Sequence, residues 1–302
     1  MSHADKKPTL TVGLPVYNSS HTVLDSVNSV LNQNWLGDLE LLVVDDGSND
    51  DTYEILSDKK KEDPRIRIVR HSENFGRPYA RNTILKYARG KYLAWIDSDD
   101  HWYPDKLRVQ FETFYKIKFY EKRKNDIICM CSFHWKWSHG EKSKEVVPNL
   151  SGDQLRKLLD GRIGAYLWSM LGETEAFRKI GYFDVNLPRL QDLDFIIRFV
   201  SKGGILVGEK KAEPLCFYNK FDEGKHPRSI SMSLQHLRKK HFPLFKKYGP
   251  VFERKCKANH HALIARHAIF NSKWVTGHAH RIVSFVNWPP TAVKEYLKNL
   301  RN

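Results

Sequence analysis

Two largely apolar segments in the first hundred residues each end in paired acids, and this pattern constrains the fold more than any other feature. Residues 40–45 (ELLVVD) run directly into Asp46, and residues 91–96 (KYLAWI) run into Asp97. Continuous apolar runs of this length are typical of buried parallel strands, and segments with helical spacing separate them along the chain. The alternation predicts a parallel sheet built from strand–helix–strand units.

The acids at the ends of these strands are candidates for ligand binding, because open parallel sheets bind ligands beyond the carboxyl ends of their strands. Asp45 and Asp46 follow one strand, and Asp97, Asp99 and Asp100 follow another. Such a group of like charges repels itself unless a cation is present. Asp97 and Asp99 are spaced to share a divalent ion through oxygen ligands, which suit Mg²⁺ or Mn²⁺. The alternative is an acidic turn that caps the next helix.

The rest of the chain gives less regular signals. Residues 126–137 are expected to form one strand with aromatic side chains, and residues 192–202 a helix that ends at Gly203. Ser151 and Gln154 have the spacing of a capping box. After Ser231 the pattern is helical.

The positive charge is concentrated in this last part of the chain. Of the net charge of +15, residues 233–302 contribute +12, from 14 Lys or Arg against two Glu. This excess indicates an anionic partner, either a lipid surface, a phosphate-bearing acceptor or nucleic acid. Nucleic acid is disfavoured because no known binding motif is present. Amphipathic helices could embed apolar residues in a bilayer, or pack the same residues in the core. These residues are Phe242, Leu244, Phe245, Tyr248 and Phe252.

Composition places the chain among globular proteins. Hydrophobic residues make up 41% of the sequence and aromatic residues 12%, which is sufficient for a packed core. The four cysteines show no C-x-x-C pairing and are expected to be reduced thiols of a cytosolic protein. The N-terminal residues lack the apolar segment of a secretory signal, and no run of about 18 apolar residues predicts a membrane span. We expect a cytoplasmic protein, soluble or peripheral on the inner face of the plasma membrane.

Eight short motifs along the chain resemble, in order and spacing, those of family 2 glycosyltransferases, which are inverting enzymes with the GT-A fold. The resemblance covers roughly residues 8–232. The motifs are Pro15–Asn18, Val44–Ser48, Ala80–Asn82, Gly90–Tyr92, Ile96–Asp100, Ile180–Asp184, Gln191–Asp194 with Arg198, and His226–Ser231.

The resemblance implies an α/β protein with a mixed, mostly parallel sheet flanked by helices and a C-terminal helical extension. Residues 1–232 would form the GT-A domain, with a nucleotide-binding half over residues 8–104 and an acceptor half over residues 105–232. Residues 233–302 would form the basic extension. The implied activity is that of a hexosyltransferase of bacterial polysaccharide, O-antigen or capsule synthesis. It would move a sugar from a nucleotide-diphosphate donor, UDP by family habit, to a hydroxyl of a glycan or lipid-linked acceptor.

The resemblance also assigns roles to individual carboxylates. Asp46 would read the nucleobase, with Tyr17 packed near the base. Asp97 would hold the ribose, and Asp99 would bind a divalent metal, Mn²⁺ or Mg²⁺. Asp192 would be the catalytic base that removes the proton of the acceptor hydroxyl.

Further donor contacts follow from the same motifs, and some alternatives stay open. Arg228 is expected to contact phosphate and His226 to bind phosphate or metal. Asp100 is a candidate for an additional metal ligand through water. The other residues expected at the donor site are Pro15, Arg77, Arg81 and Ser98.

Alternatives stay open for the catalytic base and for the acceptor subsite. Composition does not favour Asp192 over Asp194, and an ordinary helix N-cap is the alternative role for Asp192. Four aromatic residues could stack on acceptor sugars or belong to the core. They are Trp135, Trp137, Tyr166 and Trp168.

Two other functions fit parts of the sequence. A nucleotidyltransferase that makes nucleotide-sugars would need a glycine-rich loop with Lys or Arg near the N-terminus, and the sequence has none. An inactive carbohydrate-binding scaffold would have no need for all of Asp97, Asp99 and Asp192. The transferred sugar, the acceptor linkage and the oligomeric state are not specified by any motif.

Overall fold

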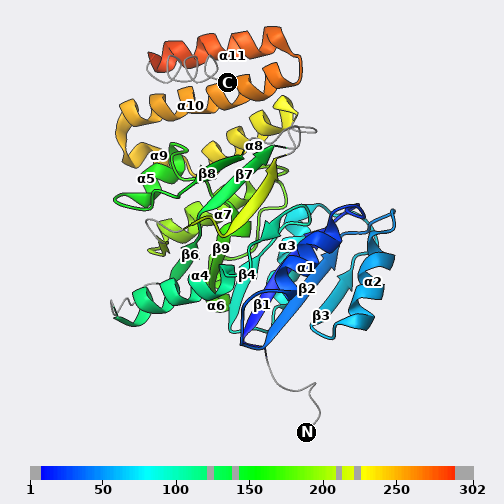
Figure 1. Ribbon diagram of the computed structural model, residues 1–302. Helices are drawn as coiled ribbons and strands as arrows, with labels where there is room; N and C mark the ends of the chain where they lie inside the picture. Colours follow the sequence, from blue (N-terminus) through cyan, green and yellow to red (C-terminus); the bar gives the residue numbers. More distant parts are fainter. Residues whose placement is uncertain (1–7, 121–125, 138–142, 209–212, 221–225, 290–302) are drawn as a thin grey trace.

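The computed structural model describes residues 8–120, 126–137, 143–208, 213–220 and 226–289 (Figure 1). The strands are β1 (Leu10–Val16), β2 (Leu39–Asp45), β3 (Ile66–Arg70), β4 (Tyr92–Trp95), β5 (His101–Trp102), β6 (Ile127–Met130), β7 (Phe133–Trp137), β8 (Ser143–Val146), β9 (Met170–Glu173), β10 (Ile205–Val207) and β11 (Cys216–Lys220). The helices are α1 (Val23–Leu31), α2 (Thr52–Glu62), α3 (Arg77–Tyr87), α4 (Lys106–Tyr115), α5 (Gln154–Leu159), α6 (Thr174–Ile180), α7 (Gln191–Ser201), α8 (Pro227–Lys240), α9 (Phe242–Lys247), α10 (Gly249–Phe270) and α11 (Trp274–Asn287). A π-helical turn, Lys116–Tyr120, follows α4, and a 3₁₀ turn, Leu167–Ser169, precedes β9.

The main sheet has seven strands in the order β10-β6-β9-β4-β1-β2-β3. Strand β9 is antiparallel to both of its neighbours, and the other pairs are parallel. The expected mixed, mostly parallel sheet is therefore confirmed. Val16 pairs with Asp45, and Gly13 pairs with Trp95, so β1, β2 and β4 end at the same edge. This register brings the acids of two separate motifs together.

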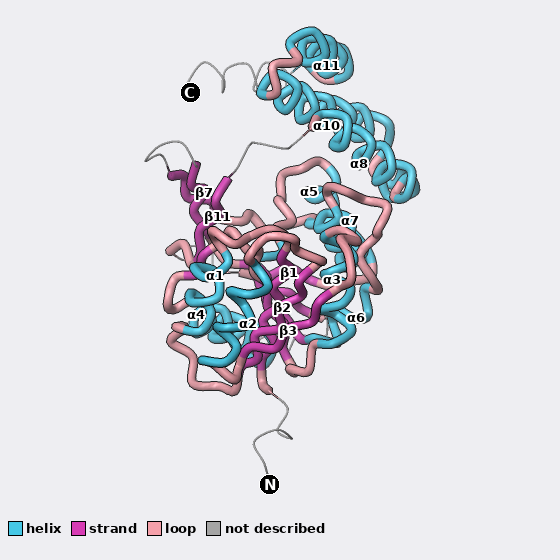
Figure 2. Tube along the Cα trace, turned by 90° about the vertical axis from the view of Figure 1, so that its right-hand side faces the viewer, coloured by secondary structure: helices cyan, strands magenta, loops and turns pink. Residues whose placement is uncertain are grey.

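Helices cover both faces of this sheet, as a sheet buried on both sides requires. The side chains of β1 pack with α1, α2 and α4 on one face. Helices α3, α6 and α7 pack on the other face with alternate residues of β2 and β4. Figure 1 shows α3 and α6 beside the strands, and Figure 2 shows the same layers from the side.

The segment of residues 126–137 forms two strands rather than the single strand expected from its sequence. β6 joins the main sheet, whereas β7 pairs with β11 and β8 in a four-stranded sheet of order β5-β11-β7-β8. Cys131 and Ser132 lie buried between them. The break has only a weak sequence signal, because Ser132 is the one residue between the two strands that favours turns and neither Gly nor Pro is present. The capping-box prediction was also wrong, because Asp153 caps α5 by accepting the backbone N–H of Arg156 at 2.9 Å.

The C-terminal helices begin inside the main core. Phe245 and Phe252 are 0% and 3% exposed and pack with Leu237, Cys256 and the residues of α7. Of the two alternatives that the sequence left open for these phenylalanines, a bilayer or the core, the structure shows the core. Helices α10 and α11 form an antiparallel pair at the far end of the molecule from β1, β2 and β3 (Figures 1 and 2). Among the described residues, no helix combines the length and apolar character needed to cross a bilayer.

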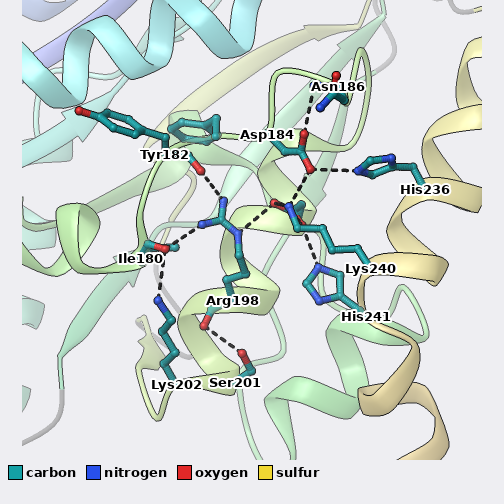
Figure 3. Close-up of polar contacts among 12 residues, drawn as sticks. Ile180, Tyr182, Asp184, Asn186, Arg198, Ser201, Lys202, His236, Lys240 and His241 are labelled. Carbon is teal, nitrogen blue, oxygen red and sulfur yellow. Dashed lines mark hydrogen bonds and ion pairs between the residues drawn. The ribbon is translucent and has the colours of Figure 1, made fainter.

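An ion-pair network fastens the end of α8 to α7 (Figure 3). Asp194 accepts hydrogen bonds from His241 Nε2 at 2.8 Å, Lys240 Nζ at 3.0 Å and Arg198 Nε at 3.0 Å. Lys240 also contacts Asp184 at 2.7 Å. The basic extension is therefore held to α7 and to Asp184 by buried charge as well as by apolar packing.

Candidate active site

The loops that follow β1, β2 and β4 enclose a cleft of about 450 Å³ at the carboxyl edge of the main sheet. We call it the strand-end cleft. Side chains cross-link the loops: the backbone N–H of Asn18 donates to Ser48 Oγ at 3.0 Å, and Ser19 Oγ lies 2.7 Å from Ser98 Oγ. Seven of the residues predicted from sequence to bind the donor or metal line this cleft. They are Pro15, Tyr17, Asp46, Arg77, Asp97, Ser98 and Asp99.

Asp46 organises one wall of the cleft. Its carboxylate lies 2.7 Å from His71 Nδ1 and accepts the backbone N–H groups of Phe75 at 3.1 Å and Gly76 at 2.8 Å. The next residue, Gly47, has a φ of +72°, and a Cβ there would lie 2.5 Å from the carbonyl carbon of Glu73. Only glycine fits this close approach. The predicted contact of Asp46 with a nucleobase would thus be made by a carboxylate that already holds the loop before α3.

Helix α3 brings two arginines to the carboxylates. Arg77 and Arg81 are four residues apart and share one face of the helix. Arg81 is 1% exposed, and its guanidinium donates to Asp97 at 3.2 Å and to Asp192. Arg77, one turn earlier on α3, lines the strand-end cleft. The predicted ribose ligand and the predicted base, 95 residues apart in sequence, are therefore joined by a single buried cation.

The surroundings of the two acids move their pKa values in opposite directions. Burial alone would raise the pKa of Asp97, but the charges of Arg81 and Arg77 hold it below its usual value. Burial raises the pKa of Asp192, the negative charge of Asp97 adds to this, and Arg81 opposes it only in part. The pKa of Arg77 is raised chiefly by Asp97. A carboxylate with a raised pKa is a better proton acceptor, which suits Asp192 to general base catalysis.

The structure separates Asp192 from Asp194, which composition could not. The side chain of Asp194 is 0% exposed and faces the cations of α8 and the following turn, whereas that of Asp192 is 20% exposed. Asp192 does not act as the N-cap of α7, because Leu190 occupies that position. Its carboxylate accepts from Arg81 and from the backbone N–H of Leu167 at 3.4 Å. Of the two acids, only Asp192 is partly open to a substrate.

Asp99 and Asp100 have the features of incomplete cation ligands. Asp99 lines the cleft. Neither carboxylate oxygen of the buried Asp100 has a well-formed hydrogen bond within the described part of the chain. Its pKa is raised well above the usual value by burial, with Asp99 and Asp97 adding, and the backbone N–H of Asn219 offsets this only in part. No group of three or more His, Cys, Asp or Glu in the described residues is arranged as a complete metal site. The residues fit a cation that takes one or two carboxylates and completes its shell with substrate phosphates and water.

The remaining predicted residues lie elsewhere. His226 is exposed at the start of α8, and Arg228 lines a separate cavity formed with α10 and α11. Neither lines the strand-end cleft in the described structure.

The predicted acceptor aromatics belong mainly to the core. Trp168 is 3% exposed and stacks on Tyr218 with ring centroids 5.3 Å apart. Trp135 and Tyr166 are partly buried and pack against the same cluster. The side chain of Trp137 lies outside the described residues.

Two features of the site had weak or no sequence signals. Arg189 is half-buried, and its pKa is lowered by burial and by the nearby charge of Arg77, which places a further cation beside the cleft. In the sequence, only the position of Arg189 three residues before Asp192 could have indicated that it lies near the site. Arg198 was noted within a motif, and its role is structural: it donates to the carbonyls of Ile180 and Tyr182, each at 2.8 Å (Figure 3).

Comparison with known proteins agrees with this geometry. The profile described as Glycosyl transferase family 2 matches residues 11–172, more than half of the chain. The chain belongs to this family. An uncharacterized glycosyltransferase of Methanocaldococcus jannaschii is 30% identical over 200 residues, which are 65% of this chain and 66% of that protein.

A second relative has a more specific name. The Escherichia coli UDP-Glc:alpha-D-GlcNAc-diphosphoundecaprenol beta-1,3-glucosyltransferase WfgD is 40% identical over 111 residues, 35% of this chain and 41% of that enzyme. The matched segment of this family 2 glycosyltransferase thus spans less than half the length of that curated relative.

Solved structures show the fold. The mannosyltransferase PcManGT of Pyrobaculum calidifontis, in complex with GDP-Man and Mn²⁺, aligns with a TM-score of 0.60 at 19% identity and covers 98% of this chain and 81% of that one. TarS of S. aureus in complex with UDP aligns with a TM-score of 0.57 at 16% identity, covering 96% and 92%. The GT-A fold expected from the sequence is confirmed.

Proposed function

We propose that this family 2 glycosyltransferase transfers a sugar from a UDP-sugar to a hydroxyl of a glycan or lipid-linked acceptor in cell-surface polysaccharide synthesis, with inversion at the anomeric carbon. One observation supports the proposal above all. Arg81 donates to both Asp97 and Asp192, and the pKa of Asp192 is raised. Asp97 belongs to the cleft that most of the other predicted donor ligands line. The UDP-Glc in the name of WfgD and the UDP in the TarS structure support a UDP-sugar, whereas the GDP-Man in the PcManGT structure supports a nucleotide-sugar donor only as a class.

In this proposal the nucleotide lies in the strand-end cleft, with its base near Tyr17 and Asp46 and its ribose near Asp97. Arg77 binds the diphosphate, because a guanidinium pairs well with phosphate oxygens. Asp192 takes the proton from the acceptor hydroxyl while that oxygen bonds to the anomeric carbon. The bond from that carbon to the diphosphate oxygen breaks at the same time, and the nucleoside diphosphate leaves.

Asp99, with Asp100 acting through water, would hold a divalent cation together with the diphosphate. When bound, such an ion neutralises the charge that develops on the leaving group. The Mn²⁺ in the PcManGT structure agrees with this assignment. His226 and Arg228 remain candidates for contacts to phosphate or metal, and these would require the start of α8 to approach the donor.

The test is release of UDP from UDP-glucose and UDP-N-acetylglucosamine, with and without Mn²⁺. Asp99→Ala should remove the stimulation by metal. Asp192→Asn should lower turnover by roughly 10²–10⁴-fold, the usual contribution of a general base, while thermal shift shows that the donor still binds. Asp51→Asn, at an exposed acid outside the cleft, is the matched control. Full turnover in both site variants would refute the assignment.

The same measurements separate this activity from the alternatives. Consumption of pyrophosphate and UDP-sugar to give a sugar 1-phosphate would indicate a nucleotidyltransferase. Donor binding without any turnover, over a panel of nucleotide-sugars and acceptors, would indicate a binding scaffold.

A peripheral position on an anionic membrane is also part of the proposal. The basic charge of the C-terminal helices and the lipid-linked acceptor in the name of WfgD support it. The acceptor would then meet the cleft at the membrane surface.

A further inference from the structure

A second cavity, of about 380 Å³, lies between α8, α10 and α11 and shares no lining residue with the strand-end cleft. We call it the α8–α11 cavity. Arg228 comes from the first turn of α8, and Lys273, Thr276 and His280 come from the start and one side of α11. The remaining lining residues are Pro227, Ser231, Met232, Gln235 and Ile264.

The polar chemistry of this cavity suits an anion. Its polar lining consists of an arginine, a lysine, a histidine, two hydroxyls and an amide, and none of the described residues that line it is acidic. Neither Arg228 nor Lys273 forms an ion pair with another described residue. Groups of this kind, brought together without a carboxylate, provide hydrogen-bond donors and positive charge for phosphate oxygens.

The histidine of the cavity is fixed by the contact between two helices. His280 Nδ1 lies 2.7 Å from Nδ1 of His261 on α10, and the two rings stack with centroids 5.0 Å apart. This contact holds the cavity side of α11 against α10. The cavity is therefore a defined feature of the helix pair.

The adjoining face of α11 is apolar and exposed. Val275, Ile282 and Val286 are 86%, 65% and 66% exposed, and Trp274 and Phe285 are 59% and 52% exposed. At 100° per residue these five side chains span about 120° of the outward side of the helix. Val283, which is 38% exposed, lies between them and the side that carries Thr276 and His280. A helix with an apolar outer face beside cationic groups is typical of segments that lie in the interface of a bilayer.

We propose that the α8–α11 cavity binds the phosphate of an anionic bilayer lipid, while the hydrocarbon lies along the outer face of α11. The charge of the cavity complements a phosphate, and the apolar face of α11 gives the attached chains a surface that free phosphate would not need. The cavity and the apolar face together also take the place of Phe245 and Phe252, which the core buries, as the contact with lipid. The inference specifies the membrane contact of the proposed function and does not depend on the transfer reaction.

The test is flotation of the full-length protein with vesicles of phosphatidylcholine alone or with phosphatidylglycerol, in the absence of donor. The wild type should bind only the vesicles with phosphatidylglycerol. Loss of one cation near an anionic surface weakens binding about fivefold, so Arg228→Gln with Lys273→Gln should weaken it about 30-fold. Lys246→Gln with Lys247→Gln removes the same charge from exposed positions on α9 outside the cavity, and should weaken binding less than threefold.

Substitution of the apolar face tests the second half of the proposal. Ile282→Ser with Val286→Ser changes only exposed side chains and should reduce vesicle binding at least tenfold without lowering Tm. If the α9 pair weakened binding as much as the cavity pair, diffuse charge attraction would replace the proposed site.

Other occupants of the surface give different results. Binding of inorganic phosphate in calorimetry, lost in Lys273→Gln and not accompanied by vesicle binding, would overturn the lipid assignment. So would a dimer in sedimentation velocity that Ile282→Ser with Val286→Ser dissociates while vesicle binding is unchanged. A protein that releases UDP from the donor but ignores vesicles refutes this inference alone. One that binds vesicles as described but never turns over refutes only the proposed function.

Discussion

The ion pairs around Asp194 should contribute a large part of the stability that holds the C-terminal helices in place. Asp194→Asn keeps the size of the side chain and removes its charge. The carboxylate is 0% exposed and has three cationic partners, so its loss leaves positive charges in the interior. Removal of one member of a buried ion pair costs about 3–5 kcal/mol.

The structure places this variant at the lower end of that range. Lys240 keeps Asp184 as a partner at 2.7 Å, and Arg198 keeps two backbone carbonyls at 2.8 Å. We therefore expect a loss of about 3 kcal/mol in the free energy of unfolding and a fall in Tm of roughly 5 °C. Urea unfolding and calorimetry measure these quantities. Hydrogen exchange should increase first in α8 and α9.

The matched control is Glu112→Gln, because Glu112 is 63% exposed and pairs with Arg108 on the surface. It should cost less than about 1 kcal/mol. The effect of pH gives an independent check. The pKa of Asp194 is lowered in the folded protein, where His241, Arg198 and Lys240 together outweigh burial. The stability that Asp194 provides is therefore complete above its unfolded pKa of about 4 and is lost as the pH falls through the folded pKa. A loss below about 1 kcal/mol at neutral pH would refute the reasoning.

Three further predictions concern the site. The pKa of Asp192 is raised, and a general base must be ionised to act. Turnover should therefore decrease on the acidic side of the pH–rate profile at a pH above the usual range of aspartate. The profile of Asp192→Asn should lack this acidic decrease. Arg81→Gln should destabilise the protein by about 3 kcal/mol in urea unfolding, since it leaves the carboxylates of Asp97 and Asp192 without their shared cation, and an unchanged midpoint would contradict the buried bridge. Asp46→Ala should lower the free energy of unfolding by about 1–3 kcal/mol, because the backbone N–H groups of Phe75 and Gly76 lose their acceptor. It should also weaken UDP binding in calorimetry, and an unchanged affinity would remove Asp46 from the donor site.

The sequence was sufficient for the fold class and for most of the donor cleft. Apolar strands that end in acids predict where ligands bind, because the carboxyl ends of parallel strands share one edge of the sheet. The Asp46 and Asp97 motifs are local, and β1, β2 and β4 bring them together through standard crossovers. Within residues 126–137, local pattern failed, because the change of sheet after Met130 depends on which strands are available for pairing.

Tertiary structure decided which of two similar acids stays partly exposed beside Arg81. Asp192 and Asp194 lie in the same turn of α7, and only the family resemblance, not composition, assigned the base to Asp192. Arg81 of α3 approaches Asp192, whereas Lys240 and His241 enclose Asp194. These partners come from elements 46 to 111 residues away, so composition could not show the different surroundings of the two acids.

Composition likewise did not determine which side chains of the basic extension are buried and which are exposed. Its charge predicted an anionic partner, and its aromatic residues suited a membrane or a core equally. Packing buries Phe245 and Phe252 in the core beside α7, whereas Phe242 of α9 and Val275 and Ile282 of α11 remain exposed. Sequence thus determined which segments are helical and charged. Only the arrangement of the helices determined which of their faces the protein buries and which it leaves to a partner.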